Sequence, residues 1–301
     1  MKNSVKGSIA LVLSRISAGA NVSCTKYLLP LWITPMGFVA IRLLFGAAFF
    51  WLLAIFERPC TATVRDKVKL FLLGASAVFG YMSLYAVGMN YTTPVNFAMI
   101  SATQPIWVFL FSVLVRNERV TAGKVLGIVL GFSGVVVAAF ASPAHGLASN
   151  RTLGNIIALV SAVCYSLYLI NSSALLRRVS NLVMLRYTFS GAAVSSLVAL
   201  LFTGLSAPMF ITPLNYTAIA VFLFVLVFPT VVSYLLVPIG LKYLKTTLVA
   251  MYGYVTLIVA TVASLLLGQD RFDFMLLLGM LFICGGIYFV GAAEKDTARS
   301  A

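Results

Sequence analysis

Ten apolar stretches, each long enough to cross a bilayer as an α-helix, follow one another along the chain. A transmembrane helix needs about 20 largely apolar residues, because in hydrocarbon every backbone polar group must be paired within the helix. The stretches lie at residues 7–29, 36–57, 68–89, 94–115, 122–141, 153–173, 183–204, 215–238, 246–267 and 273–293. Because 61% of the residues are hydrophobic and 9% are charged, we predict an all-α membrane protein of ten transmembrane helices.

The net charge of +14 fits a membrane protein better than a nucleic-acid-binding protein. Nucleic-acid binding needs a basic face in water, whereas most of these charges lie in or beside the short connections between apolar stretches. With the N-terminus inside, fifteen Lys and Arg residues fall on the inner side, and only Arg151 and Arg271 fall on the outer side. The positive-inside rule therefore places both termini in the cytoplasm of a multi-pass protein of the bacterial cytoplasmic membrane.

The chain contains an internal repeat. An offset of 152 residues aligns YTTPVNFAMI at 91–100 with YLKTTLVAMY at 243–252. Earlier in each half, an offset of 144 residues aligns Arg42 in FVAIRLLFGAA with Arg186 in LVMLRYTFSGAA. Such self-similarity indicates that one structural unit occurs twice. The ten predicted helices therefore divide into two units of five.

The two units are predicted at residues 1–145 and 146–301. Because five is an odd number, the second unit starts on the opposite side of the membrane, and the two units are inverted relative to each other. Inverted repeats form two similar halves whose interface can open to either side of the membrane, as alternating access requires. A secondary transporter is therefore the leading functional hypothesis.

The chain resembles the drug/metabolite transporter superfamily, and within it the ten-helix EamA-type exporters. The resemblance rests on the two five-helix repeats, Arg42 and Arg186, the stretch GMNYTTPVNFAMISATQP at 88–105, and the RNER turn that precedes Gly127 and Gly134. It covers nearly the whole chain, and it implies the ten-helix fold and a transport role. It leaves the substrate open, because members of the superfamily carry amino acids, nucleotide sugars, sugar phosphates and other metabolites.

One position departs from the pattern of this superfamily. Pro105 resembles the family's proline in the fourth helix, but its counterpart at the offset of 152 is Leu257. Proline lacks a backbone N–H and kinks a helix. We therefore expect the helix at 246–267 to lack the corresponding kink. We assign Pro105 and Pro229 a gating or structural role.

Four basic residues and no acidic residue fall inside the predicted spans, away from their first turns. They are Arg15, Lys26, Arg42 and Arg186. A charge in hydrocarbon costs roughly 3 kcal/mol or more, so each cation should face a cavity or a partner. The absence of a buried carboxylate argues against a proton-coupled exporter of aromatic cations. The cargo that these cations favour is an anion or a carboxylate.

Depth in the membrane separates the four cations. A rise of about 1.5 Å per residue places Arg15 near the midplane, where it contacts either cargo or a neighbouring helix. Arg42 and Arg186 lie nearer the ends of their spans, and we expect them to have equivalent gating or structural roles. Lys26 lies near the outer interface, where we expect a structural role with its ammonium group reaching the headgroups.

Small and polar residues follow one face of the first predicted helix. Ser14, Ser17, Asn21 and Thr25 recur at helical spacing beside Arg15. Such a row favours close packing between membrane helices. It could equally form one wall of a substrate path, and the sequence leaves both interpretations open.

Polar and aromatic side chains also occur near mid-depth in other helices. Tyr and Trp are normally enriched at the membrane interfaces, so their presence deeper in the membrane suggests a pocket for a small amphipathic molecule. Thr256 lies at a similar depth. No catalytic residue, metal site or cofactor is predicted. The predicted substrate-binding residues are Arg15, Asn21, Tyr81, Gln104, Trp107, Tyr165, Tyr168, Ser233, Tyr234 and Tyr252.

These features lead to two transport hypotheses. The first is export of a small metabolite such as a neutral or aromatic amino acid or a related carboxylate. The second is uptake or exchange of a nucleoside-like or phosphorylated solute, which two or more basic residues in one cavity would favour. A membrane-embedded enzyme is disfavoured, because the spans hold no nucleophile with a base, no carboxylate pair and no metal-ligand set. The sequence leaves open whether transport is coupled to protons or a counter-substrate, and whether the protein is a monomer or a dimer.

Overall fold

The structure is a computed structural model that describes residues 2–29, 31–57, 62–116, 120–141, 150–211, 214–268 and 274–299. Within these ranges the secondary structure is entirely helical. Part of the RNER turn and the predicted boundary between the two units at residues 145 and 146 lie outside the described residues. The prediction of an all-α chain is confirmed for the part of the protein that the structure describes.

The helices follow the predicted apolar stretches closely. In the first half they are α1 (Lys2–Leu28), α2 (Pro35–Ala54), α3 (Val64–Leu73), the π-helix η1 (Gly74–Val78), α4 (Phe79–Tyr91), α5 (Pro94–Ser101), α6 (Gln104–Arg116) and α7 (Ala122–Ala141). In the second half they are α8 (Arg151–Leu175), α9 (Asn181–Thr203), the 3₁₀ turn η2 (Pro208–Phe210), α10 (Tyr216–Val225), the π-helix η3 (Leu226–Val232), α11 (Ser233–Tyr243), α12 (Thr246–Met251), α13 (Gly253–Leu266) and α14 (Phe274–Arg299).

Seven helices or helical runs are long and apolar enough to cross a membrane. They are Pro35–Ala54, Val64–Tyr91, Pro94–Val115, Thr152–Leu175, Asn181–Thr203, Tyr216–Tyr243 and Thr246–Leu266. α7 and α14 contain shorter apolar segments, at Ala122–Gly134 and Leu277–Val290. α1 is not among the seven, and it carries Arg15 and the row of polar residues. The structure therefore shows a multi-pass membrane protein, and a set of ten membrane crossings stays a prediction.

Local sequence signals explain where several helices begin and end. The Thr63 hydroxyl accepts a hydrogen bond from the backbone N–H of Asp66 and so caps α3. Thr93 caps α5 in the same way, with Pro94 at the first helical position. These side chains satisfy N–H groups that have no partner within the helix. α9 ends at Gly204, whose φ of 70° is a conformation that glycine adopts without a steric penalty.

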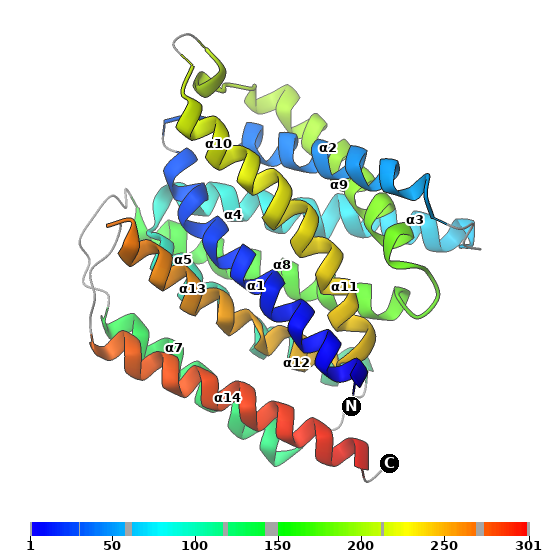
Figure 1. The fold of residues 1–301 in the computed structure, drawn as a ribbon, viewed down its shortest axis with the longest axis vertical. Coiled ribbons are helices and arrows are strands. Elements are labelled where there is room, and N and C mark those ends of the chain that lie inside the picture. The colour runs from blue at the N-terminus through cyan, green and yellow to red at the C-terminus, as the bar shows by residue number, and fades with distance from the viewer. Residues whose placement is uncertain are drawn as a thin grey trace.

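The helices pack as a bundle in which α1 lies centrally (Figure 1). α1 contacts α11 on one side and α13 on the other, and α8 contacts α4, α5 and α6. α2 packs along α9, whereas α7 and α14 pack along each other at one edge of the molecule (Figure 1). The N- and C-terminal ends lie at the same end of the bundle (Figure 1). This arrangement brings α1 together with helices from both halves of the chain.

Two long helical runs are interrupted near their middle. α5 ends before a turn at Ala102 and Thr103, and α12 ends before a turn at Tyr252. The run at 246–267, which has no proline at the counterpart of Pro105, is continuous through Leu257 but is interrupted earlier, at Tyr252. Gly253 directly follows the turn, and glycine is the weakest helix former after proline. A hydrogen bond from Val255 N to Tyr252 O, at 3.0 Å, closes the turn.

Glycines allow α9 to cross α3 and η1 at backbone contact. A Cβ atom at Gly74 would overlap the carbonyl oxygen of Thr188. A Cβ atom at Gly191 would overlap the carbonyl oxygen of Phe71. Small residues at such crossings let membrane helices approach closely, which is how they gain packing energy in lipid. The crossing fixes the position of α9 against the first half of the chain.

Candidate functional site

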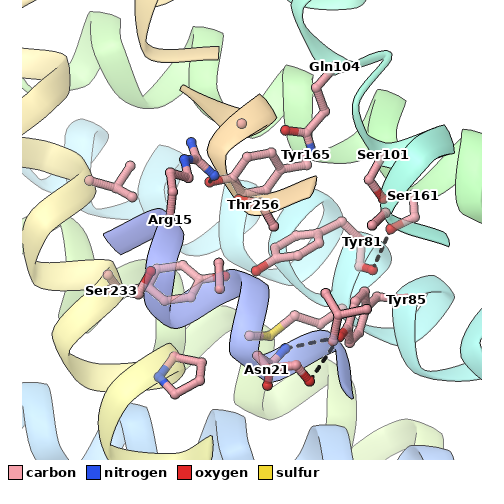
Figure 2. A pocket seen from close by; sticks show the side chains of 18 of the residues that line it. Arg15, Asn21, Tyr81, Tyr85, Ser101, Gln104, Ser161, Tyr165, Ser233 and Thr256 are labelled. Atoms are coloured by element: carbon pink, nitrogen blue, oxygen red, sulfur yellow. Dashed lines mark hydrogen bonds between the residues drawn. The ribbon is translucent and has the colours of Figure 1, made fainter. Parts of the chain in front are cut away.

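A cavity of about 120 Å³ lies inside the bundle, beside α1. Its lining comes from α1, α2, α4, α5, α6, α8, η3, α11 and α13, and therefore from both halves of the chain. Figure 2 shows the cavity from close by, with the guanidinium group of Arg15 beside Tyr165 and with Asn21 beside Tyr85 at the opposite end. Polar and aromatic side chains point into the space between these two ends (Figure 2).

Most of the predicted substrate-binding residues lie together in this lining. The seven that line the cavity are Arg15, Asn21, Tyr81, Gln104, Tyr165, Ser233 and Tyr234. Thr256, which the sequence placed at a similar depth, also lines it, as do Arg42 and Pro229 from the predicted gating or structural set. The geometry therefore gathers these side chains at one place, and their contact with substrate stays a prediction.

Three predicted substrate-binding residues lie outside the lining. Trp107 donates from Nε1 to the Thr103 hydroxyl one turn earlier, at 3.3 Å. Tyr168 is fully buried beside the cavity, with its ring centroid 5.8 Å from that of Tyr165. Tyr252 forms the turn between α12 and α13. Their depth in the bundle is similar to that of the lining residues, but they lie elsewhere around their helices.

Arg15 is buried at one end of the cavity and is only partly paired. It is 5% exposed, and its Nη1 donates to the hydroxyl of Tyr165 at 3.3 Å. The guanidinium carbon lies 5.7 Å from the centroid of the Tyr165 ring. Nε and Nη2 make no hydrogen bond with any residue that the structure describes. Both nitrogens are enclosed by protein in the conformation shown, and because a buried donor without a partner costs free energy, this edge of the guanidinium group would gain from a ligand that reaches it.

Arg42 is held by a proline-containing segment of the other half of the chain. Pro229 has no N–H, so it cannot pair with the carbonyl of Val225 as a regular helix would. The Thr230 hydroxyl donates to that carbonyl at 2.9 Å. The same hydroxyl accepts a hydrogen bond from Nε of Arg42, also at 2.9 Å. The irregular helix η3 therefore creates the site that positions Arg42 beside the cavity.

The polar row on α1 serves both packing and the cavity. The hydroxyl groups of Ser14 and Ser233 lie 2.6 Å apart and join α1 to α11. Asn21 donates from Nδ2 to the hydroxyl of Tyr85 at 3.0 Å, which closes one end of the cavity. Tyr85 in turn donates to Thr25 at 3.3 Å. Ser14 therefore serves helix packing and Asn21 lines the cavity, and a substrate path along this row stays a prediction.

Several lining residues were not predicted from the sequence. Tyr85 and Ser161 are among them, and Ser161 donates to the carbonyl of Tyr81 at 2.9 Å. Tyr85 lies four residues after Tyr81 on α4, and Ser161 lies four residues before Tyr165 on α8. Residues four apart share one face of a helix. This spacing was the signal in the sequence that could have identified both residues.

The ammonium group of Lys26 does not lie where we predicted, at the headgroups. Its side chain is 8% exposed, and its Nζ donates to the carbonyls of Met89 at 3.0 Å and Thr92 at 2.8 Å. These carbonyls lie at the C-terminal end of α4, where the last turn of a helix has no N–H partners of its own. A cation is favourable there because it also opposes the helix dipole. Lys26 therefore joins the end of α1 to the end of α4.

Arg42 and Arg186 occupy different environments, which corrects the expectation that they are equivalent. Arg186 does not line the cavity, and its guanidinium carbon lies 5.1 Å from the centroid of Trp51 and 5.4 Å from that of Tyr187. Arg42 lines the cavity and is 5% exposed. A cation over aromatic rings is stabilised by their electron-rich faces. Arg186 therefore joins α9 to α2 through aromatic stacking, whereas Arg42 carries charge at the cavity.

The lining gives the cavity a positive character. Arg15 and Arg42 both line it, and among the residues that the structure describes the lining contains no Asp or Glu. The hydroxyl groups of Tyr234 and Thr256 have no hydrogen-bond partner among the described residues. Tyrosine rings supply the apolar surface. Such a lining can bind a small anionic group next to an apolar or aromatic body.

Comparisons with known proteins agree with this arrangement. The model of the EamA-like transporter family matches residues 5–140 and 152–292. The uncharacterised transporter YvbV of Bacillus subtilis (strain 168) is 28% identical over 308 residues, which cover 100% of this chain and 97% of YvbV. YyaM, another uncharacterised transporter of that strain, is 25% identical over 283 residues, which cover 92% of this chain and 91% of YyaM.

A solved crystal structure shares the fold. It has a TM-score of 0.72 to this chain at 20% identity, with 98% of each chain covered. The family match and the apolar helices show a multi-pass membrane transporter, located in bacteria in the cell membrane, and they point away from an enzyme. The resemblance to EamA-type transporters is confirmed. The chain belongs to the EamA-like transporter family.

Proposed function

We propose that the protein is a secondary transporter that works by alternating access and exports a small carboxylate-bearing metabolite, such as a neutral or aromatic amino acid or a related carboxylate. The observation that carries the proposal is Arg15, which is buried in a cavity without acids and keeps Nε and Nη2 unpaired. A buried cation in a membrane protein marks a functional site when no protein anion neutralises it. A carboxylate of the cargo supplies the missing partner.

The packing of the helices supports the inverted repeat on which alternating access depends. In the proposed repeat α1 corresponds to α8, α2 to α9 and α7 to α14. The first of these helices contacts α11 and α13, and its counterpart contacts α4, α5 and α6. α2 packs on its counterpart α9, and α7 packs on its counterpart α14. Exchanging the two halves therefore reproduces several of the main contacts, such as α1 with α11 and α8 with α4, as two related units would.

Irregular helix geometry also recurs at the offset of the sequence repeat. η1 begins at Gly74, and η3 begins at Leu226, which lies 152 residues later. The family model matches two separate segments, 5–140 and 152–292. π-helical turns are rare and often occur at functional sites. Their matched positions support two units that bend at equivalent points.

The size of the cavity supports a small cargo. About 120 Å³ is slightly less than the 150 Å³ of a protein cavity that holds one benzene molecule. A small amino acid or carboxylate is of this size, whereas an aromatic amino acid needs a wider conformation of the cavity and a nucleotide sugar is several times larger. In the conformation shown, the cavity therefore favours the first transport hypothesis.

One observation favours the second hypothesis, a carrier that takes up or exchanges a nucleoside-like or phosphorylated solute. Arg15 and Arg42 both line one cavity, and two cations bind a phosphate group well. The volume of the cavity argues against a nucleoside with its attached phosphate. We therefore keep this function as the second candidate.

Counterflow in proteoliposomes tests the proposal. Purified protein is reconstituted, the vesicles are loaded with one unlabelled solute at a time, and uptake of the labelled solute is followed. The panel contains neutral and aromatic amino acids, 2-oxo acids, nucleosides and sugar phosphates, with protein-free vesicles as the control. We expect accelerated exchange with small carboxylates. Acceleration by sugar phosphates or nucleosides alone would support the second candidate. If no solute accelerates exchange, both candidate functions are contradicted.

A further inference from the structure

The geometry points to a cargo with net negative charge: the cavity binds a small 2-oxo or 2-hydroxy monocarboxylate in preference to the zwitterionic amino acid of the same skeleton. This inference rests on the proposed transport function and narrows its substrate class. The inference rests on three observations: Nε and Nη2 of Arg15 have no hydrogen-bond partner among the described residues, Arg42 is a second cation in the lining, and the described part of the lining contains no carboxylate.

The unpaired edge of Arg15 matches a carboxylate. Nη1 is used by the Tyr165 hydroxyl at 3.3 Å, which leaves Nε and Nη2 free. In a planar guanidinium group these two nitrogens point their hydrogens along one edge, in parallel. Two parallel N–H donors pair with the two oxygens of a carboxylate in the bidentate arrangement. Tyr165 therefore holds the guanidinium group with this edge unpaired, and the cargo is inferred to reach it when the enclosing side chains shift.

Arg42 adds a second positive charge that no acid of the lining neutralises. Its Nε is used by Thr230 at 2.9 Å, and within the described residues no further hydrogen bond holds its terminal nitrogens. The side chain is 5% exposed, so water screens its charge poorly. An anion entering the cavity is attracted by both guanidinium groups. A zwitterion gains the same attraction at its carboxylate but brings an ammonium group into the same field.

The cavity offers an ammonium group poor compensation. Asn21 and Tyr85 use their polar groups on each other and on Thr25. The remaining polar groups include the Gln104 amide and the hydroxyls of Tyr234 and Thr256, all of which are neutral. The hydroxyls of Tyr234 and Thr256 have no partner among the described residues and are enclosed in the conformation shown, so a shift that uncovers them would let them donate to the 2-oxo or 2-hydroxy oxygen of an anion. The tyrosine rings then contact its apolar side chain.

Counterflow with matched pairs of solutes tests the inference. The pairs are pyruvate with alanine, 4-methyl-2-oxopentanoate with leucine, and phenylpyruvate with phenylalanine, each in proteoliposomes and in protein-free vesicles at neutral pH. We expect at least one 2-oxo acid to accelerate exchange tenfold or more above its amino acid. Equal or faster exchange with the amino acids overturns the inference and leaves the proposed function standing. No acceleration with any member of the three pairs contradicts both.

Variants then test whether Arg42 produces the preference. We expect Arg42→Gln to reduce the ratio of 2-oxo acid to amino acid exchange at least tenfold, and Arg42→Lys to retain most of it. Arg178→Gln removes an exposed arginine after α8 and should leave the ratio unchanged. An unchanged ratio in Arg42→Gln overturns the role of Arg42. If Arg42→Gln yields no folded protein, thermal shifts of the wild type and of Arg42→Lys in the presence of each solute replace it as the test. Equal stabilisation by the amino acids and by the 2-oxo acids overturns the inference.

Discussion

The hydroxyl of Tyr165 accepts a hydrogen bond from Nη1 of Arg15 at 3.3 Å, while the Tyr165 ring lies under the guanidinium group at 5.7 Å from its carbon. One residue of α8 thus fixes both the rotation and the plane of the charged group on α1. These helices are the first of their respective halves in the predicted repeat. The contact therefore links the two halves at the end of the cavity that holds Arg15.

Removing the hydroxyl of Tyr165 should weaken transport without unfolding the protein. We expect Tyr165→Phe to reduce exchange about fivefold, because a single hydrogen bond contributes roughly 1 kcal/mol and the aromatic ring stays in place. Tyr254→Phe is the matched control, because Tyr254 is fully buried, lies outside the cavity, and has a hydroxyl with no partner among the described residues. Exchange rates per folded protein check the difference, and equal rates in the two variants would argue against a positioning role for Tyr165.

Arg42 and Arg186 should respond differently to replacement by lysine. Lysine keeps the charge but loses the planar group that stacks on aromatic rings and donates at fixed angles. We expect Arg186→Lys to lower the unfolding temperature by a few degrees, with exchange per folded protein retained, because Arg186 stacks on Trp51 and Tyr187. We expect Arg42→Lys to slow exchange. Thermal unfolding and counterflow on both variants check this, and matching phenotypes would restore the equivalence that the repeat suggested.

The Thr230 hydroxyl should contribute measurably to stability. Thr230→Val keeps the shape of the side chain but leaves Arg42 Nε without its partner and removes the hydroxyl's hydrogen bond to the Val225 carbonyl. Buried groups that lose a hydrogen bond cost about 1–3 kcal/mol each, so we expect a destabilisation of about 2 kcal/mol or more. Thr230→Ser retains the hydroxyl and should be close to wild type. Denaturant unfolding in detergent compares the two variants, and equal stabilities would contradict this role.

The backbone crossing of α9 should not tolerate a methyl group. We expect Gly74→Ala to reduce the yield of folded protein severely, because its Cβ would overlap the Thr188 carbonyl oxygen, which is backbone and cannot rotate away. Gly80→Ala is the matched control, because the nearest atom to its Cβ would be the Cys164 Sγ at 3.8 Å. Size-exclusion profiles and unfolding temperatures measure the effect. Similar behaviour of the two variants would show that the crossing is looser than the structure indicates.

Much of the site could be predicted because depth in the membrane follows from counting residues. The rise per residue places Arg15, Tyr81 and Tyr165 near mid-depth, and the polar row on α1 indicates Asn21; all four line the cavity. Trp107 has a similar depth but faces elsewhere. Membrane helices are apolar on most sides, so the sequence does not fix their rotation as an amphipathic pattern would.

The different environments of Arg42 and Arg186 could not be predicted from the repeat, because partners come from other helices. Thr230 binds Arg42, and its counterpart at the offset of 152 is Val78, which has no hydroxyl. The break at Tyr252 was missed for a related reason. A helix can be interrupted without a proline, and Gly253 weakens this run directly after Tyr252.

The central claim is that the free edge of Arg15 binds the carboxylate of the cargo, and counterflow by Arg15 variants tests it most directly. We expect Arg15→Ala to reduce exchange of the carboxylate panel at least about a hundredfold, because two charge-assisted hydrogen bonds are lost. Arg15→Lys should retain only a small fraction of the rate, since lysine cannot bind a carboxylate through two parallel donors. Both variants should fold, because Arg15 makes a single hydrogen bond with the described residues. Near-normal exchange by folded Arg15→Ala would contradict the account.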